Sequence, residues 1–273
     1  MNKPKIHPSA IVDPGAKIGS NVVIEPFAIV GKDVVIGNNC RIGPHSVVEF
    51  TEMGEGCQVF PFASIGLPPQ HTRYKGEKTK VVTGKNCTFR EGVTVHRGTL
   101  FDQGVTTIGD NGFFMAYSHI AHDCRIGNNV ILANGALLAG HVEVGDNCFI
   151  SASTGIHQFV RLGKCVMVSG GSMVPLDVAP FCIAQGDRAQ IRGLNVVGMR
   201  RMGMPRESID LVKNAYRALF FSGLPLEEAL QQPAVQAKDD FVVTFRDFFS
   251  KKKRGFTRPS SETDQIDGEE SFQ

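Results

Sequence analysis

Apolar residues recur at every sixth position along most of this chain. One series runs from Ile6 to Val48, and another runs from Ile108 to Val174 through twelve consecutive positions. An amphipathic strand has a period of two and a helix a period of 3.6, so neither alone explains a period of six. A short strand, a tight corner and another short strand do explain it. Twelve successive matches also argue against a chance pattern within a β-sandwich.

The repeat slips in phase and is interrupted twice between these two series. It continues through 53–65 and resumes through 83–95. The first interruption, residues 66–80, is polar and basic, and the second covers residues 98–107. Solenoids place such insertions as loops on one face, which is often the binding face.

Three short sides close one coil, so residues 18 positions apart should stack directly on one another, about 4.8 Å apart. Gly, Asn and Asp at the corners supply the positive φ that tight turns require. Stacked coils bury a continuous apolar column. The sequence therefore predicts a parallel β-solenoid over residues 1–190, with loops at 66–80 and 98–107.

The chain changes character near residue 200. Pro205 and Gly223 bracket a helical pattern, and the remaining segment is less regular. Helices are expected at 206–221, 224–229 and 241–249. We therefore expect a helical domain at 191–258, followed by a polar, acidic and disordered tail at 259–273.

Composition narrows the function classes. The formal net charge of +2 argues against binding nucleic acid through bulk charge. No segment has the roughly 20 apolar residues that a membrane helix needs, and the N-terminus lacks a secretory signal. The seven cysteines are scattered without a CxxC pair, which indicates reduced thiols. We therefore expect a cytoplasmic protein with no membrane insertion, no cofactor and no metal.

Four of the eight histidines converge on one edge of the predicted prism. On an 18-residue coil counted from Ile108, they fall at positions 11 to 15, within three successive coils. These residues are His119, His122, His141 and His157. Gly140 and Gln158 stack on His122, and Asp123 stacks on His141. Such convergence favours a functional site over four unrelated surface side chains.

The chemistry of that edge suits acyl transfer without a covalent nucleophile. His122 is the candidate general base, with the Asp123 carboxylate beside it. Gly140 has no side chain, so its N–H could approach a developing oxyanion. No GxSxG or Walker-type motif is present. Two alternatives stay open at this point: a zinc site made by the clustered histidines, and a purely structural polar stack.

Longer motifs carry a family resemblance over nearly the whole chain. They are SHIAHDCRIGNNVILAN (118–134), LAGHVEVGD (138–146), GIHQFVRLG (155–163), IAQGDRA (183–189) and GLNVVGMRRMG (193–203). Together they resemble the UDP-N-acetylglucosamine O-acyltransferases of lipid A biosynthesis. The resemblance implies a homotrimeric left-handed β-helix with active sites between subunits. It also implies that a 3-hydroxylated fatty acyl group passes from acyl carrier protein to the glucosamine 3-OH.

The resemblance also implies a role for each matching residue. His122 would be the general base, Asp123 would orient it, and the Gly140 N–H would hold the thioester oxyanion. The residues implied in substrate binding are Gln70, His71, Arg73, His119, His141, His157, Gln158, Gly170, Asn195 and Arg201. Among them, Asn195 and Arg201 would contact the nucleotide and its phosphates, and Gly170 falls where the family sets acyl length.

The chain departs from the family pattern near the acceptor. His71 and Thr72 replace the usual Asp-Leu, Arg73 replaces Lys, and Val197 replaces Glu. Acylation of a 3-amino analogue of the sugar therefore stays an alternative. Arg161, Lys164 and Arg217 are candidate surface cations for docking the acidic carrier protein.

Overall fold

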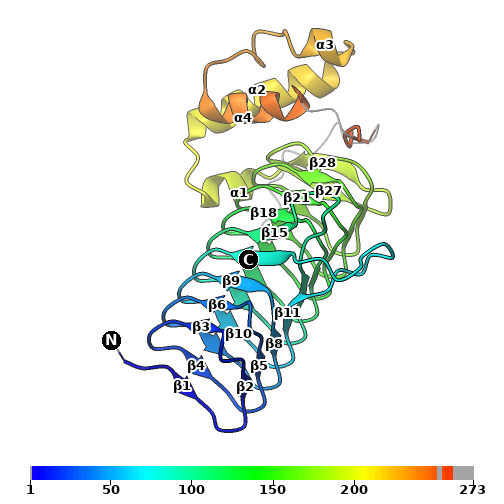
Figure 1. Ribbon diagram of the computed structural model, residues 1–273. Coiled ribbons are helices and arrows are strands. Elements are labelled where there is room, and N and C mark those ends of the chain that lie inside the picture. The colour runs from blue at the N-terminus through cyan, green and yellow to red at the C-terminus, as the bar shows by residue number, and fades with distance from the viewer. Residues whose placement is uncertain (1, 251–253, 261–273) are drawn as a thin grey trace.

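The computed structural model describes residues 2–250 and 254–260, and shows a three-sided prism wound from short strands (Figure 1). Successive strands occupy the three sides in turn, so each coil lies on the one before it. The predicted left-handed parallel β-helix with a C-terminal helical region is confirmed. Three sheets run the length of the prism.

The first side is an eleven-stranded sheet, parallel except for its last pair. Its strands are β1 (Lys5–Ile6), β4 (Val23–Ile24), β7 (Arg41–Ile42), β10 (Gln58–Val59), β13 (Thr88–Phe89), β16 (Phe113–Phe114), β19 (Ile131–Leu132), β22 (Phe149–Ile150), β25 (Met167–Val168), β27 (Cys182–Gln185) and β28 (Gln190–Leu194). The antiparallel pair β27–β28 ends the regular winding.

The second side is a nine-stranded parallel sheet, and it forms one wall of the site described below. Its strands are β2 (Ile11–Val12), β5 (Ile29–Val30), β8 (Val47–Val48), β11 (Ser64–Leu67), β14 (Thr94–His96), β17 (His119–Ile120), β20 (Leu137–Leu138), β23 (Gly155–Ile156) and β26 (Met173–Val174).

The third side is an eight-stranded parallel sheet. Its strands are β3 (Lys17–Ile18), β6 (Val35–Ile36), β9 (Thr51–Met53), β12 (Lys80–Thr83), β15 (Val105–Ile108), β18 (Arg125–Ile126), β21 (Glu143–Val144) and β24 (Arg161–Leu162). Because β12 begins at Lys80 and β15 at Val105, regular winding resumes inside both expected insertions.

The six-residue repeat fills the interior. Its apolar residues from Ile24 to Val174 are buried, whereas Ile6 at the open N-terminal end is exposed. Stacking follows the expected spacing, as in the pairing of Ile120 with Leu138. All seven cysteines are buried and free. The interior is therefore a continuous apolar column, and polar chemistry is confined to the outer faces and corners.

Corner residues adopt the left-handed backbone that the tight turns require. Non-glycine residues do so as well, including Asn129, Asp123 and His141 with φ of 55°, 60° and 62°. Asn tolerates this region better than most residues because its side chain can hydrogen-bond locally. Residues other than Gly and Asn at such positions are candidates for a functional role.

Both insertions leave the prism as neighbouring loops, which contact each other through His71 and Phe101 (Figure 1). The rings of these two residues lie 5.0 Å apart. The loops therefore stand over the same part of the prism.

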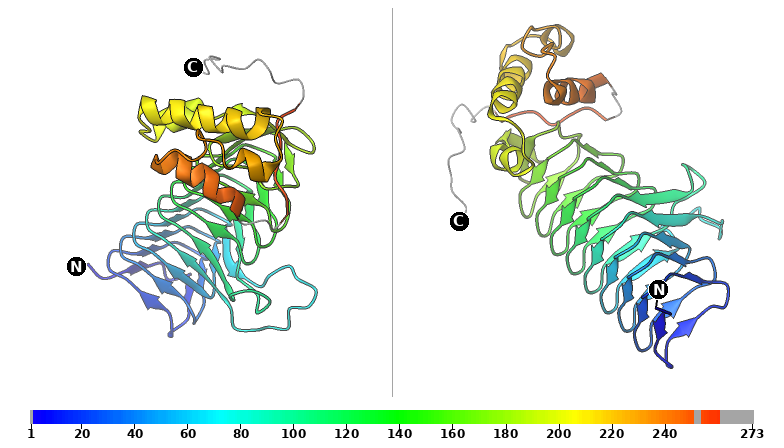
Figure 2. Two further views of the ribbon diagram at one scale, coloured as in Figure 1. Left: turned by 90° about the horizontal axis from the view of Figure 1, so that it is seen from above. Right: turned by 90° about the vertical axis from the view of Figure 1, so that its left-hand side faces the viewer.

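Within the described part of the chain, four α-helices follow the solenoid and lie beyond its C-terminal end (Figure 2). They are α1 (Val196–Arg201), α2 (Arg206–Phe221), α3 (Leu226–Ala229) and α4 (Asp240–Asp247), and the 3-10 turn η1 (Phe248–Ser250) extends α4. Helix α2 occupies its expected range, while α1 was not expected from the sequence. No helix in residues 2–250 or 254–260 is both long and apolar enough to cross a membrane.

The segment after the helices returns to the solenoid. Phe256 bridges to Asp177, and Pro259 bridges to Ile191. The expected disordered tail at 259–273 thus includes two residues that are placed against the prism, and residues 261–273 lie outside the described part of the chain.

Candidate active site

A cavity of about 570 Å³ lies on the outer face of the nine-stranded sheet, across β17, β20, β23 and β26. Its lining residues are Gln70, His96, His119, Ala121, His122, Leu137, Leu138, Ala139, Gly140, Gly155, Ile156, His157, Gln158, Met173, Val174, Pro175 and Arg188. Six residues expected from the sequence are among them: Gln70, His119, His122, Gly140, His157 and Gln158. The lining combines histidine side chains with apolar residues of successive strands, among them Leu137 and Met173.

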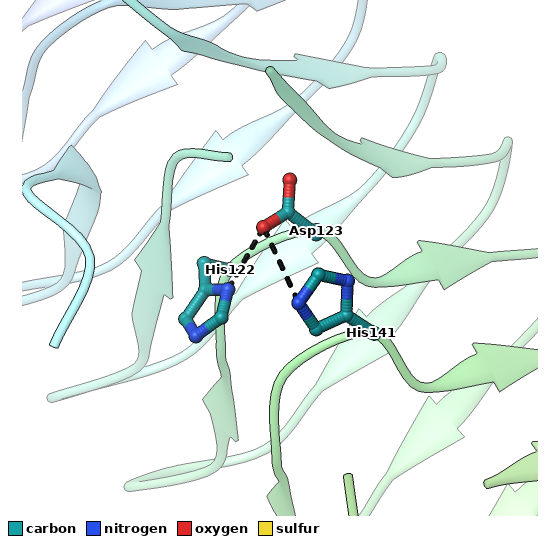
Figure 3. Close-up of side chains that lie close together, drawn as sticks. All are labelled: His122, Asp123 and His141. Carbon is teal, nitrogen blue, oxygen red and sulfur yellow. Dashed lines mark hydrogen bonds and ion pairs between the residues drawn. The ribbon is translucent and has the colours of Figure 1, made fainter. Parts of the chain in front are cut away.

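His122 and Asp123 form a hydrogen-bonded pair at the corner after β17 (Figure 3). Nδ1 of His122 lies 2.8 Å from Oδ2 of Asp123. The carboxylate is 1% exposed and lies behind the ring, whereas His122 lines the cavity. The pair therefore directs the other ring nitrogen, Nε2, towards the cavity.

Thr99 fixes the Asp123 carboxylate from the second loop. Its N–H donates to Oδ1 at 2.9 Å and its hydroxyl donates to Oδ2 at 2.7 Å. Burial by itself would raise the pKa of Asp123, but the hydrogen bonds from His122 and Thr99 outweigh burial and lower it. An ionised carboxylate only accepts hydrogen bonds, so Nδ1 of His122 must donate. The neutral ring then carries its lone pair on Nε2.

Gly140 lies one coil above His122, and the space beside it is occupied by that ring. A Cβ atom at Gly140 would lie 2.6 Å from Cε1 and 2.8 Å from Nε2 of His122. The Gly140 N–H makes no hydrogen bond to any residue within 2–250 or 254–260. Because Gly140 has no side chain, the His122 ring can occupy this space, and the unpaired Gly140 N–H lies next to the ring.

His141 is held by a second carboxylate. Its Nδ1 lies 3.1 Å from Oδ2 of Asp102, and its Nε2 lies 3.8 Å from Oδ2 of Asp123. Arg125 also binds Asp102, with Nη2 at 2.9 Å from each carboxylate oxygen. Asp102 belongs to the second loop, residues 98–107, and was not expected as a site residue. The six-residue repeat does not extend through this loop, so it cannot predict where loop residues lie relative to the coils.

Two further histidines lie deeper in the same wall. Burial, followed by the nearby His119 and His122, lowers the pKa of His96 to about 4. Burial and His122 also lower the pKa of His119. His119 accepts from or donates to Thr94 Oγ1 at 2.7 Å, while Nδ1 of His96 has no partner among the described residues. Near the His122–Asp123 pair, the protein environment therefore favours the neutral forms of His96 and His119.

The first loop, residues 66–80, brings its expected residues close to the His122–Asp123 pair. The ring of His71 meets the ring of His122 edge-on at 5.3 Å, and Arg73 stacks over Phe101 at 4.3 Å. Gln70 reaches the cavity itself.

Six expected substrate-binding residues do not line this cavity. His71, Arg73 and His141 belong to the ring contacts around His122 and Phe101, and the other three lie elsewhere. Gly170 lies in the corner between β25 and β26. Asn195 caps α1, accepting from the Gly198 N–H and donating to the Cys165 carbonyl. Arg201 is exposed in the last turn of α1. Their roles stay predictions.

The apolar wall of the cavity was missed from the sequence, although the repeat contained the signal. Leu137, Gly155 and Met173 occupy the same outward column as His119, each 18 positions from the next. Of the three candidate docking cations, Arg161 was wrong, because it is buried against Asp177 at 2.7 Å, whereas Lys164 and Arg217 stay predictions.

Two family models match the chain. Residues 177–257 match the model described as UDP-N-acetylglucosamine O-acyltransferase, domain 2, and residues 15–49 and 105–140 match the bacterial transferase hexapeptide repeat. An acyl-(acyl-carrier-protein)–UDP-N-acetylglucosamine O-acyltransferase of Thermodesulfovibrio yellowstonii is 48% identical over 256 residues, covering 93% of this chain and 99% of the relative. The chain belongs to this acyltransferase family.

Solved structures of family members share the fold. The UDP-N-acetylglucosamine acyltransferase from Campylobacter jejuni has a TM-score of 0.89 at 44% identity, covering 94% of this chain and 100% of its own. The Francisella novicida enzyme has a TM-score of 0.90 at 35% identity, covering 96% and 97%. The family resemblance predicted from the sequence is confirmed.

Proposed function

We propose that the protein transfers a (3-hydroxy)fatty acyl group from an acyl carrier protein thioester to the 3-OH of UDP-N-acetylglucosamine, as the first step of lipid A biosynthesis. The observation that carries the proposal is the His122–Asp123 pair facing a cavity beside the free N–H of Gly140. Membership of the family supports the donor and acceptor classes. Such a donor favours a cytoplasmic location.

His122 acts as the general base in this proposal. Nε2 takes the proton of the sugar hydroxyl as its oxygen attacks the thioester carbonyl carbon, and the Gly140 N–H donates to the developing oxyanion. The new C–O bond forms, the C–S bond breaks, and His122 returns the proton to the departing sulfur. Asp123 stabilises the imidazolium and holds its orientation.

The acyl chain lies along the apolar wall in this proposal. Leu137 and Met173 are half exposed on the outer face of the sheet, and the Met173 side chain lies over Gly155. Exposed apolar side chains beside a polar reaction centre suit a fatty acyl group with a polar head. His119 and His157 flank the wall and contact the polar portions of the substrates.

The active enzyme is a homotrimer in this proposal, with each site completed by a neighbouring subunit. Asn195 and Arg201 lie apart from the cavity of their own chain. A second copy would supply them to the nucleotide, where the Arg guanidinium suits a diphosphate. Sedimentation equilibrium of the full chain tests the trimer, and a monomer with full activity would contradict it.

Transfer to a 3-amino sugar is the second candidate, favoured by one contact. His71, which departs from the family pattern, meets the ring of His122 directly. It therefore stands where the acceptor group must approach the base.

Mass spectrometry of the product decides between the two acceptors. The enzyme is given a panel of acyl carrier protein thioesters with either UDP-N-acetylglucosamine or its 3-amino analogue. We expect an ester of the 3-hydroxyl sugar. A product formed only as the amide would replace the first proposal with the second, and no product with any pair would reject both.

A further inference from the structure

Three side chains bring potential metal-ligand atoms together at the edge of the cavity (Figure 3). One ligand atom from each of His122, Asp123 and His141 lies within 4.8 Å of the other two. Ligand atoms around a tetrahedral Zn²⁺ lie about 3.3 Å apart, given bonds of about 2.0–2.1 Å. The two contacts of the Asp123 carboxylate, 2.8 Å to His122 and 3.8 Å to His141, bracket that spacing.

The orientation of His141 favours a cation at this point. Nδ1 of His141 is paired with Asp102, so Nε2 is the ring nitrogen left to bind a metal ion. Nε2 lies 3.8 Å from Oδ2 of Asp123. A Zn²⁺ ion between these two atoms would be bound by both of them.

Both ends of the cluster are supported from behind, as ligands of bound metals usually are. Asp102 orients the His141 ring and is itself held by Arg125. Thr99 holds both oxygens of Asp123. The ligand types select among ions, because two imidazoles and one carboxylate suit Zn²⁺, whereas Mg²⁺ prefers oxygen ligands and water.

We propose that His122, Asp123 and His141 form an inhibitory Zn²⁺ site. Zinc bound to Nδ1 of His122 takes the place of the proton that Asp123 now accepts. The single proton of the neutral ring then sits on Nε2, the atom that faces the cavity, and His122 cannot accept a proton from substrate. Zinc here is an inhibitor and not a cofactor. The inhibition rests on the proposed role of His122, whereas zinc binding does not.

Zinc affinity of the untagged full-length protein, measured by competition with a chromophoric chelator, tests the site. We expect about one Zn²⁺ per chain and a tetrahedral Co²⁺ absorption spectrum. His141→Gln removes a ligand and should weaken zinc at least tenfold. Asp102→Asn removes the support of His141 and should weaken zinc about 10–100-fold. Millimolar Mg²⁺ should not compete.

His157→Gln is the matched control, because His157 is an imidazole of the same cavity outside the cluster. Its zinc affinity should equal that of the wild type. Circular dichroism without zinc checks that each variant is folded. Equal zinc affinity in the wild type, His141→Gln and Asp102→Asn would overturn the site.

Activity separates the two proposals. Zinc should abolish acyl transfer, and EDTA should restore it. Stoichiometric zinc without loss of activity would overturn the inhibition. An enzyme that is inactive in EDTA with every donor and acceptor would contradict the proposed function and leave the binding result standing.

Discussion

Two corners of the same coils share one type of backbone turn but differ in how their backbone N–H groups are paired. At the corner that leads into the eleven-stranded sheet, a side chain of one coil accepts a hydrogen bond from the backbone of the coil before it in several places. The Asn128 N–H, for example, donates to Oδ1 of Asp146 at 2.8 Å. At the corner after the nine-stranded sheet, the corresponding position holds Gly140, and its N–H has no acceptor among the described residues. The Asn128 N–H is paired at the first corner, whereas the Gly140 N–H at the second is unpaired among the described residues and is the donor that we propose for the substrate.

The difference teaches where this solenoid places its chemistry. The left-handed position of the first corner is occupied by Asn129, which tolerates such a backbone, and that of the second by Asp123 and His141. A repeat that builds the same turn many times can exchange its corner side chains while the buried column stays unchanged. We call the corner of Asn128 and Asn129 the structural corner. We call the corner of His122, Asp123, Gly140 and His141 the chemical corner, because it holds the proposed base and the proposed backbone donor.

The largest expected effect comes from removing the base of the chemical corner. His122→Ala should lower kcat for acyl transfer by roughly 10²–10⁴-fold, the range for lost general-base catalysis. The thermal midpoint should also fall modestly, because the buried Asp123 carboxylate loses one hydrogen-bond partner, so turnover is measured well below the midpoint of the variant. Turnover within a few-fold of the wild type would remove His122 from the mechanism.

Gly140→Ala should lower turnover by about 10²-fold, because a displacement of about 1 Å in a catalytic group has effects of that size. The new methyl group would stand 2.6 Å from the His122 ring and push it out of line. Gly31→Ala is the matched control, since its nearest neighbour is the flexible Cγ of Glu49 at 3.3 Å. Equal losses in both variants would mean that the effect is on folding and not on His122.

Acid should destabilise the wall beside the chemical corner. Burial lowers the pKa of His96 to about 4, below the usual 6.5, so the unfolded chain takes up this proton first as the pH falls. The contribution is intact above about pH 6.5 and is lost towards pH 4, by up to about 3 kcal/mol. His96→Gln should flatten the pH dependence of the unfolding free energy over this interval. An unchanged slope in the variant would mean that His96 is accessible to protons in the folded state.

The smallest effect is expected at the structural corner. Asp146→Ala removes the acceptor for the backbone N–H and the side-chain amide of Asn128. The unfolding free energy should fall by about 1 kcal/mol, with turnover within two-fold of the wild type. A calorimetric scan and a steady-state assay measure the two quantities. If Asp146→Ala lost as much activity as Gly140→Ala, the two corners would not differ in their importance for turnover.

The sequence by itself determined the winding and the location of the site. A period of six fixes the three-sided coil, and the coil of 18 residues places His119, His122, Gly140 and His157 on one edge, because each step of the repeat has a fixed position in space. The same 18-residue spacing also places Leu137, Gly155 and Met173 in one outward column, although this was not recognised from the sequence. Helix α2 was likewise bounded by Pro205 and Gly223.

Only the tertiary structure decided which groups support the site from outside the repeat. Asp102 and Thr99 lie in a loop, where the chain has no period, so no count along the sequence could place them against His141 and Asp123. Burial of Arg161 depends on Asp177 in a later coil. Hydrogen bonds between loop and coil depend on distances that local pattern does not encode, and those bonds set the tautomer of His122.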